Sequence, residues 1–116
     1  MSQKDQAVPK LYDFIQWLLP QVAKFPRSHK FTLGDRIINL VLDTLQLLIK
    51  ATYRKQKVEL LQEANLNLEQ LRYLIRLCKD LNLLGLKRYE YASKGVNEVG
   101  KLIGGWIKQQ QRRQHP

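Results

Sequence analysis

Apolar residues recur at intervals of three and four along almost the whole chain, and this helical period restricts its fold more than any other feature. No stretch alternates β-branched and polar residues in the way that a half-buried strand does. Helices joined by short connections pack against their neighbours in antiparallel pairs. We therefore expect an all-α protein, an antiparallel up-down four-helix bundle, with helices over residues 8–24, 33–54, 58–83 and 86–109.

The 116-residue chain suits one domain with one shared core. We assign residues 1–116 to that single domain, ordered over about 8–109, and expect residues 110–116 to form a frayed basic tail. Pro9 suits the first turn of its helix, where a missing N–H costs nothing. Pro20 is expected to kink the same helix or to loosen one turn.

Two later boundaries also carry local signals. Thr32 followed by Asp35 has the arrangement of a capping box, so the second helix is expected to start after Thr32. Gly85 is predicted to cap the carboxyl end of the third helix. In the fourth helix, a coiled-coil-like apolar seam has four-three spacing, and it consists of Ala92, Val96, Val99, Ile103 and Trp106.

The second predicted helix has more apolar surface than a small monomer needs. Its apolar residues cover roughly 220° of a helical wheel, whereas a surface helix needs little over about 100°. The helix either lies deep in the bundle, or it uses Leu40 and Leu47 as a seam with another copy. Because a 116-residue bundle has few ways to surround one helix, we favour a homo-oligomer with Leu40 and Leu47 in its interface.

The chain carries 20 Lys and Arg against 10 Asp and Glu, a formal net charge of +10. Such an excess attracts nucleic acid, an acidic protein or an anionic membrane surface, although it can also serve only to keep a protein soluble. No apolar run approaches the ~20 residues of a membrane span, and the N-terminal MSQKDQAVPK lacks the apolar centre of a signal peptide. We expect a cytoplasmic protein that does not bind membranes.

Three groups of positive charge are candidate nucleic-acid contacts. They are a basic stripe on the third helix (Arg72, Arg76, Lys79), a corner cluster between the second and third helices (Lys50, Arg54, Lys55, Lys57) and an end cluster (Lys24, Arg27, Lys30). Glu69 and Asp80 flank the basic stripe, so it is either a functional surface or an ordinary solvated face. No zinc-finger, RNP or bZIP pattern is present, so contacts are expected mainly with phosphates and with little sequence preference.

The end cluster lies in the stretch KFPRSHKFTLGDR, which is expected to be a loop with two roles. Phe25 and Phe31 are expected to pack on the end of the bundle, and Pro26 to stop the first helix. The three cations of the end cluster are then free to face phosphates.

Catalysis and metal binding are not expected. His29 and His115 are the only histidines, and Cys78 has no Cys or His within a turn, so we predict no metal, no cofactor and no enzymatic activity. Cys78 lies on the apolar side of its helix and is interpreted as a small core residue.

Three longer segments carry a family resemblance, and they are LYDFIQWLLPQVAKFPRSHKFTLGDRI, ANLNLEQLRYLIRLCKDLNLL and YEYASKGVNEVGKLIGGWIK. Together they resemble the accessory variability determinant (Avd) proteins of diversity-generating retroelements, over about residues 11–108. The FPRS, TLGDRI, RLCKDL and GGWIK motifs are specific as a set. The wider family includes small bundles encoded within ribosomal RNA intervening sequences, which share the helical pattern.

This resemblance implies a four-helix bundle that assembles into a pentameric, ring-like homo-oligomer with a basic surface. It implies binding of RNA and/or DNA with low sequence specificity, and binding of the retroelement's reverse transcriptase, which copies template RNA into mutagenised cDNA. It also carries a nucleic-acid role to Arg72, Arg76 and Lys79. Two non-enzymatic alternatives remain open: a stand-alone bundle of the intervening-sequence type, and an adaptor for an acidic protein.

Overall fold

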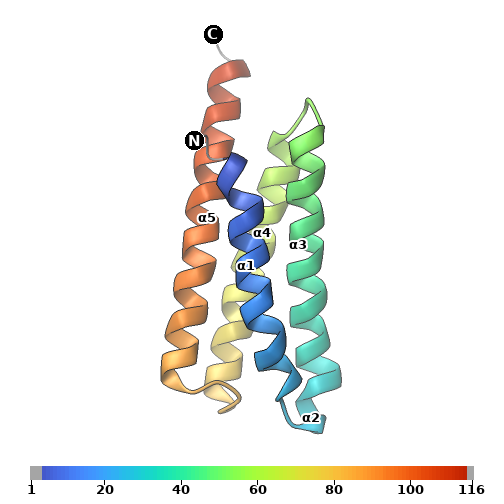
Figure 1. Cartoon of the computed structure of the whole chain (residues 1–116), viewed down its shortest axis with the longest axis vertical. Coiled ribbons are helices and arrows are strands. Elements are labelled where there is room, and N and C mark those ends of the chain that lie inside the picture. The colour runs from blue at the N-terminus through green and yellow to red at the C-terminus, as the bar shows by residue number, and fades with distance from the viewer. Residues whose placement is uncertain (1–3, 115–116) are drawn as a thin grey trace.

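The computed structural model describes residues 4–114, and within them it contains four long helices and no strand (Figure 1). The long helices are α1 (Lys4–Ala23), α3 (Asp35–Tyr53), α4 (Val58–Asp80) and α5 (Leu86–Gln114). A short helix α2 (Arg27–His29) and a π-helical turn η1 (Lys30–Gly34) lead directly into α3. The prediction of an all-α four-helix bundle is confirmed.

The long helices follow one another around the bundle in the order α1, α3, α4 and α5, and each runs antiparallel to the next (Figure 1). α4 packs against both α3 and α5, and α1 closes the bundle between α5 and α3. The predicted α5 seam is confirmed, because all five of its residues from Ala92 to Trp106 are 0% exposed. None of the described helices has a stretch that is long and apolar enough to cross a membrane.

The start of α1 and the end of α5 extend beyond their predicted bounds. α1 begins at Lys4, so Pro9 lies inside the helix rather than in its first turn, and the helix continues through Pro20 to Ala23. α5 continues to Gln114, which places Arg112 and Arg113 on a helix instead of in the predicted frayed tail. The last two residues of that tail lie outside the described residues.

Asn82, not Gly85, ends α4. The N–H of Leu83 donates to the carbonyl of Cys78 at 2.8 Å, and the N–H of Asn82 donates to that of Lys79 at 3.0 Å, which is the Schellman pattern. This pattern needs a left-handed residue, and Asn82 supplies it with φ of 60°. Gly85 instead lies before α5, where its carbonyl accepts the N–H of Tyr89 at 2.9 Å. The prediction of a Gly85 cap for this helix is wrong.

The stretch from Lys24 to Arg36 is mostly helical, so the prediction of a loop that ends at Thr32 is also wrong. Pro26 begins the new helix, because its carbonyl accepts the N–H groups of His29 and Lys30 at 2.9 Å each. Thr32 lies inside η1 and forms no side-chain cap. Phe25 packs in the core as expected, but Phe31 is 61% exposed.

The surplus apolar surface of α3 is divided between its two sides. Ile37, Val41 and Leu48 are buried, and the predicted seam residues Leu40 and Leu47 are half-buried against the molecule's own core. A different pair on this helix reaches the surface, since Leu42 is 38% and Ile49 is 41% exposed.

A glycine allows α1 to approach α5 closely. A Cβ atom on Gly95 of α5 would lie 2.5 Å from Cδ1 of Phe14 on α1, which is closer than real Cβ contacts. The ring of Trp17 extends the same contact, with its centroid 4.5 Å from that of Tyr91. Gly104 on the same helix has no neighbouring atom within 4 Å of such a Cβ, so its lack of a side chain serves no packing purpose.

We predict that Gly95→Ala destabilises the protein and that Gly104→Ala stabilises it. The Cβ of the first variant forces Phe14 out of place, at a cost of about 1–3 kcal/mol in the free energy of unfolding. The second variant gains about 1 kcal/mol, because alanine is the better helix former. Urea unfolding followed by circular dichroism measures both, and a Gly95→Ala protein as stable as wild type would contradict the close approach.

Candidate nucleic-acid interface

The basic stripe of α4 lies along the groove between α4 and α5. Arg72 reaches across this groove, where its Nε donates to Oδ1 of Asn97 on α5 at 3.2 Å. The Nζ of Lys79 lies 5.1 Å from the ring centroid of Tyr89, also on α5. The stripe therefore belongs to a surface that both helices form.

The three cations of the stripe differ in how strongly they are engaged. Arg72 is half-buried and forms an ion pair with Glu69 one turn earlier on α4. Arg76 is exposed and forms no ion pair with another described residue. Asp80, the other flanking acid, pairs with none of them. Arg72 is thus held in a fixed position, while Arg76 and Lys79 keep their charges available at the surface.

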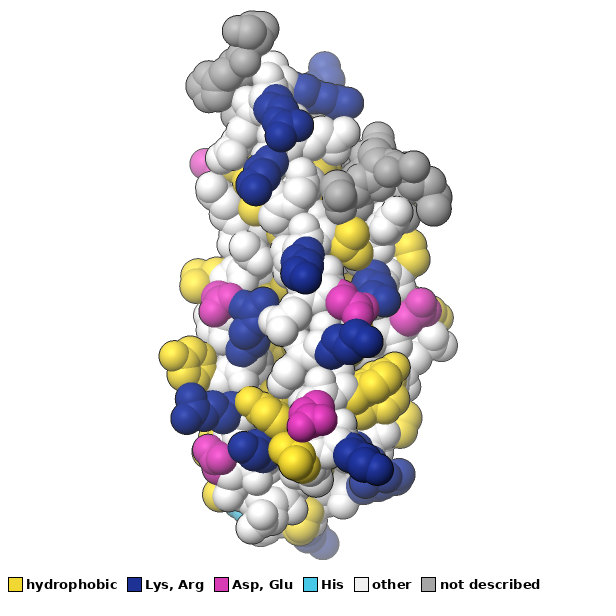
Figure 2. Space-filling view, turned by 90° about the vertical axis from the view of Figure 1, so that its left-hand side faces the viewer, with side chains coloured by type: hydrophobic (Ala, Val, Ile, Leu, Met, Phe, Trp, Pro, Cys, Tyr) yellow, Lys and Arg dark blue, Asp and Glu magenta, His cyan; other side chains and the backbone are white. Residues whose placement is uncertain are grey.

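The outward side of α5 carries a row of lysines at seven-residue intervals. This α5 row consists of Lys87, Lys94, Lys101 and Lys108. All four are exposed, and none forms an ion pair with another described residue. At a rise of 1.5 Å per residue, successive lysines are about 10.5 Å apart and the row is about 32 Å long. Lys and Arg side chains occur from one end to the other of this face of the bundle (Figure 2).

The α5 row was not recognised in the sequence analysis, although its signal is present in the sequence. The buried seam of α5 repeats every seven residues, and the lysines have the same period. When Val96 and Ile103 take the inner positions of this repeat, Lys94 and Lys101 fall at its outermost position.

The other two predicted clusters lie far from one another. The end cluster occupies the turn from α1 into α2 and η1, at one end of the bundle, and the corner cluster occupies the α3–α4 turn at the other end (Figure 1). The 19 residues of α3 separate them, a distance of about 28 Å along the helix. The structure therefore does not bring the end and corner clusters together into one site.

Lys57 of the corner cluster has a structural role. Its ammonium group donates to the carbonyls of Ala51 and Arg54 at 2.5 Å each, at the carboxyl end of α3. A positive charge is favourable there because the last carbonyls of a helix have no partners within it. Lys50, Arg54 and Lys55 remain exposed at the same corner.

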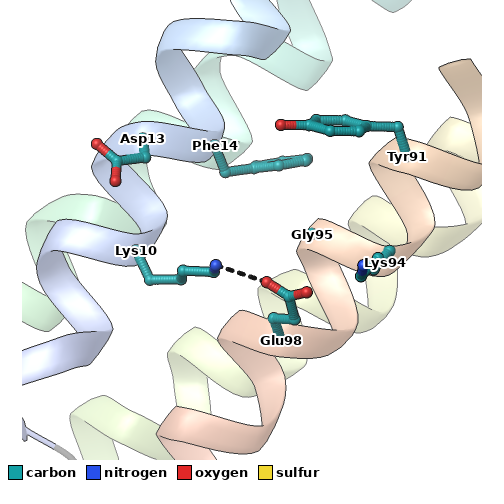
Figure 3. A pocket seen from close by; sticks show the side chains of 7 residues that line it. All are labelled: Lys10, Asp13, Phe14, Tyr91, Lys94, Gly95 and Glu98. Carbon is teal, nitrogen blue, oxygen red and sulfur yellow. Dashed lines mark ion pairs between the residues drawn. The ribbon is translucent and has the colours of Figure 1, made fainter.

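A hollow of about 250 Å³ lies between α1 and α5 (Figure 3). Lys10 Nζ and Glu98 Oε2 lie 2.6 Å apart across it. Their hydrogen bond raises the pKa of Lys10 and lowers the pKa of Glu98, so both groups are charged at neutral pH. Neither is poised to exchange a proton with a substrate. The ring of Phe14 points toward Gly95 beside the pair, so the hollow belongs to the close contact of the two helices.

The predicted place of Cys78 in the core is confirmed, because its side chain is 0% exposed. Burial raises the pKa of this thiol to about 11, so it is protonated at neutral pH and a poor nucleophile. Among residues 4–114, no three His, Cys, Asp or Glu side chains lie together as a metal site would require. His29 is half-buried in α2, and His115 lies outside the described residues.

We predict that Lys57→Met lowers the free energy of unfolding by about 1 kcal/mol, because the last carbonyls of α3 lose a charged donor. Lys55→Met is the matched control, since it removes an equally charged but exposed side chain at the same corner. Thermal unfolding of the two variants measures the difference. Equal melting temperatures would contradict a capping role for Lys57.

A comparison of the sequence with protein families was made alongside the structure. The model of the bAvd-like family matches residues 7–110, which is most of the chain. A search against curated proteins found no significant match. The resemblance seen in the sequence is thereby confirmed at the level of the family, and the chain belongs to the bAvd-like family.

Proposed function

We propose that this protein is a non-enzymatic accessory subunit of a diversity-generating retroelement. It binds RNA and/or DNA with low sequence specificity, together with the reverse transcriptase of the element, and supports mutagenic cDNA synthesis and retrohoming in the cytoplasm. Family membership supports the retroelement and the reverse transcriptase partner. The observation that carries nucleic-acid binding is the α5 row beside the basic stripe of α4.

The two sets of cations suit a phosphate backbone. The α5 row presents, along a straight line, exposed ammonium groups that form no ion pair with any described residue. Arg76 and Lys79 add charge across the neighbouring groove. Such contacts gain affinity by releasing counterions from the polyanion, so binding falls steeply with salt and depends little on base sequence. A net charge of +10 also speeds the encounter with a polyanion.

We further propose that the subunit acts as a homo-oligomer, with the pentameric ring that the sequence resemblance implies. An apolar strip lies on the side of the bundle that α1 and α3 form together, which we call the α1–α3 edge. This strip supports self-association. Leu42 and Ile49 of α3 are exposed there, and Tyr12 of α1 is 54% exposed. In the order of the helices around the bundle, this edge is on the opposite side from the basic α4–α5 edge. A ring needs two different contact surfaces on each copy. We propose the strip as one of them, which leaves the basic edge outside that contact.

We predict that replacing Lys94, Lys101 and Lys108 of the α5 row with Gln weakens binding of a fluorescein-labelled single-stranded RNA, measured by anisotropy. Three lost phosphate contacts lower the slope of log Kd against log salt concentration by about two. Reversing the basic stripe to Glu at Arg72, Arg76 and Lys79 should abolish binding, while circular dichroism shows the helices intact.

Lys50→Gln, Arg54→Gln and Lys55→Gln together form the matched control for the α5 row. They remove the same amount of positive charge, but from the α3–α4 turn. Equal losses in the two triple variants would mean that net charge alone attracts the RNA. If the variant with Glu at Arg72, Arg76 and Lys79 still binds the RNA, the basic stripe is only an ordinary solvated face. No binding at low salt by the wild-type protein would overturn the nucleic-acid role and favour the acidic-protein adaptor.

We predict that light scattering of the wild-type protein gives a mass near that of five chains. Leu42→Gln with Ile49→Gln should shift the mass toward one chain, because the strip loses its apolar contacts. Leu66→Gln with Leu86→Gln is the control, since these leucines are 58% and 60% exposed on other surfaces. A monomeric wild-type protein would contradict the proposed oligomer.

A further inference from the structure

A hollow of about 340 Å³ opens in the groove between α4 and α5, next to the α5 row. Its lining combines two aromatic rings, two cations, one carboxylate and two uncharged polar side chains, namely Tyr73, Tyr89, Arg72, Arg76, Glu69, Ser93 and Asn97. By comparison, the lining of the hollow between α1 and α5 has one tyrosine and no arginine.

Tyr73 contributes little to the folded core. Its side chain is 71% exposed on α4, and its ring stacks on no other described aromatic residue. Its ring is therefore accessible from solvent and can contact a planar ligand. Tyr89, on the facing side of the groove, is half-buried and has the ammonium of Lys79 near its ring.

The contacts of Arg72 fix the shape of this hollow. Its guanidinium group is tied to Glu69 on α4 and to Asn97 on α5, so the floor of the groove is held in place before any ligand arrives. Arg76 stands at the same hollow with its charge unpaired among the described residues. A preformed floor and a free cation at the mouth suit a planar group attached to a phosphate.

We propose that this hollow takes one unpaired base of a single-stranded polynucleotide, stacked on the ring of Tyr73, while Arg76 and the α5 row hold the phosphates on either side. The inference rests on the proposed nucleic-acid function and adds the form of nucleic acid to it. A base within a duplex is already stacked on both faces and cannot present one to the tyrosine.

The chemistry of the lining also explains low sequence preference. Every base has an aromatic face that can stack on Tyr73, and stacking does not distinguish the four bases strongly. The hydroxyl of Ser93 both donates and accepts a hydrogen bond, so it suits the edge of any base. Together these groups recognise that a base is present and unpaired, rather than which base it is.

The test compares two labelled oligonucleotides of equal length and charge by fluorescence anisotropy. One is a strand of twelve thymidines, and the other has the same sugar-phosphate backbone with abasic sites throughout. The wild-type protein should bind the thymidine strand about five- to 150-fold more tightly, because one stacked base contributes that much. Tyr73→Leu should bring this ratio close to one without changing affinity for the abasic strand, and Tyr73→Phe should keep the ratio.

Tyr53→Leu is the matched control, since it removes a tyrosine that is 85% exposed at the carboxyl end of α3 and should leave the ratio unchanged. Equal wild-type affinity for the two strands, with steep salt dependence, would overturn the stacking site and leave the phosphate interface intact. If Tyr73→Leu lowers the affinity for both strands equally, the ring supports the shape of the groove and does not stack on a base. If the wild-type protein binds neither strand at low salt, the proposed function itself fails.

Discussion

The seven-residue repeat of α5 determines more of this protein than any other feature, because it fixes two sides of the helix together. The inner positions of the repeat, from Ala92 to Trp106, are fully buried in the core that all four long helices share. Once they are buried, the outermost position of the same repeat must face solvent along a straight line. That position holds lysine four times, so the packing of the core also creates the charged row.

The close approach of α1 to α5 depends on the same helix. Gly95 lets the ring of Phe14 lie against the backbone of α5, and the Lys10–Glu98 ion pair closes the outside of this contact. With α1 held on one flank of α5 and α4 on the other, the outward side of α5 remains uncovered. The groove between α4 and α5 then joins the α5 row to Arg76 and to the exposed ring of Tyr73. Phosphate binding and base stacking are thus proposed for adjoining parts of one surface.

Charged and apolar surfaces lie on different edges of the bundle. The α4–α5 edge carries the cations available for a polyanion, and the α1–α3 edge carries the exposed apolar side chains of Tyr12, Leu42 and Ile49. This separation would allow the proposed self-association and the proposed nucleic-acid binding to occur at once, because neither surface covers the other. The clusters at the two ends of α3 do not join that basic edge, and one of their lysines, Lys57, instead stabilises a helix end.

The sequence by itself determined the four helices, the single core and the α5 seam, because the apolar period of a helix depends only on residue spacing. It also determined the place of Cys78 and the excess of positive charge. Helix ends were predicted less well, because spacing does not reveal the backbone hydrogen bonds of Asn82 and Pro26 or the bonds from the Lys57 ammonium group to backbone carbonyls. Only the tertiary structure decided which cations share a surface. Arg72 meets Asn97, and Tyr73 meets the groove of α5, because two antiparallel helices place residues far apart in the chain side by side.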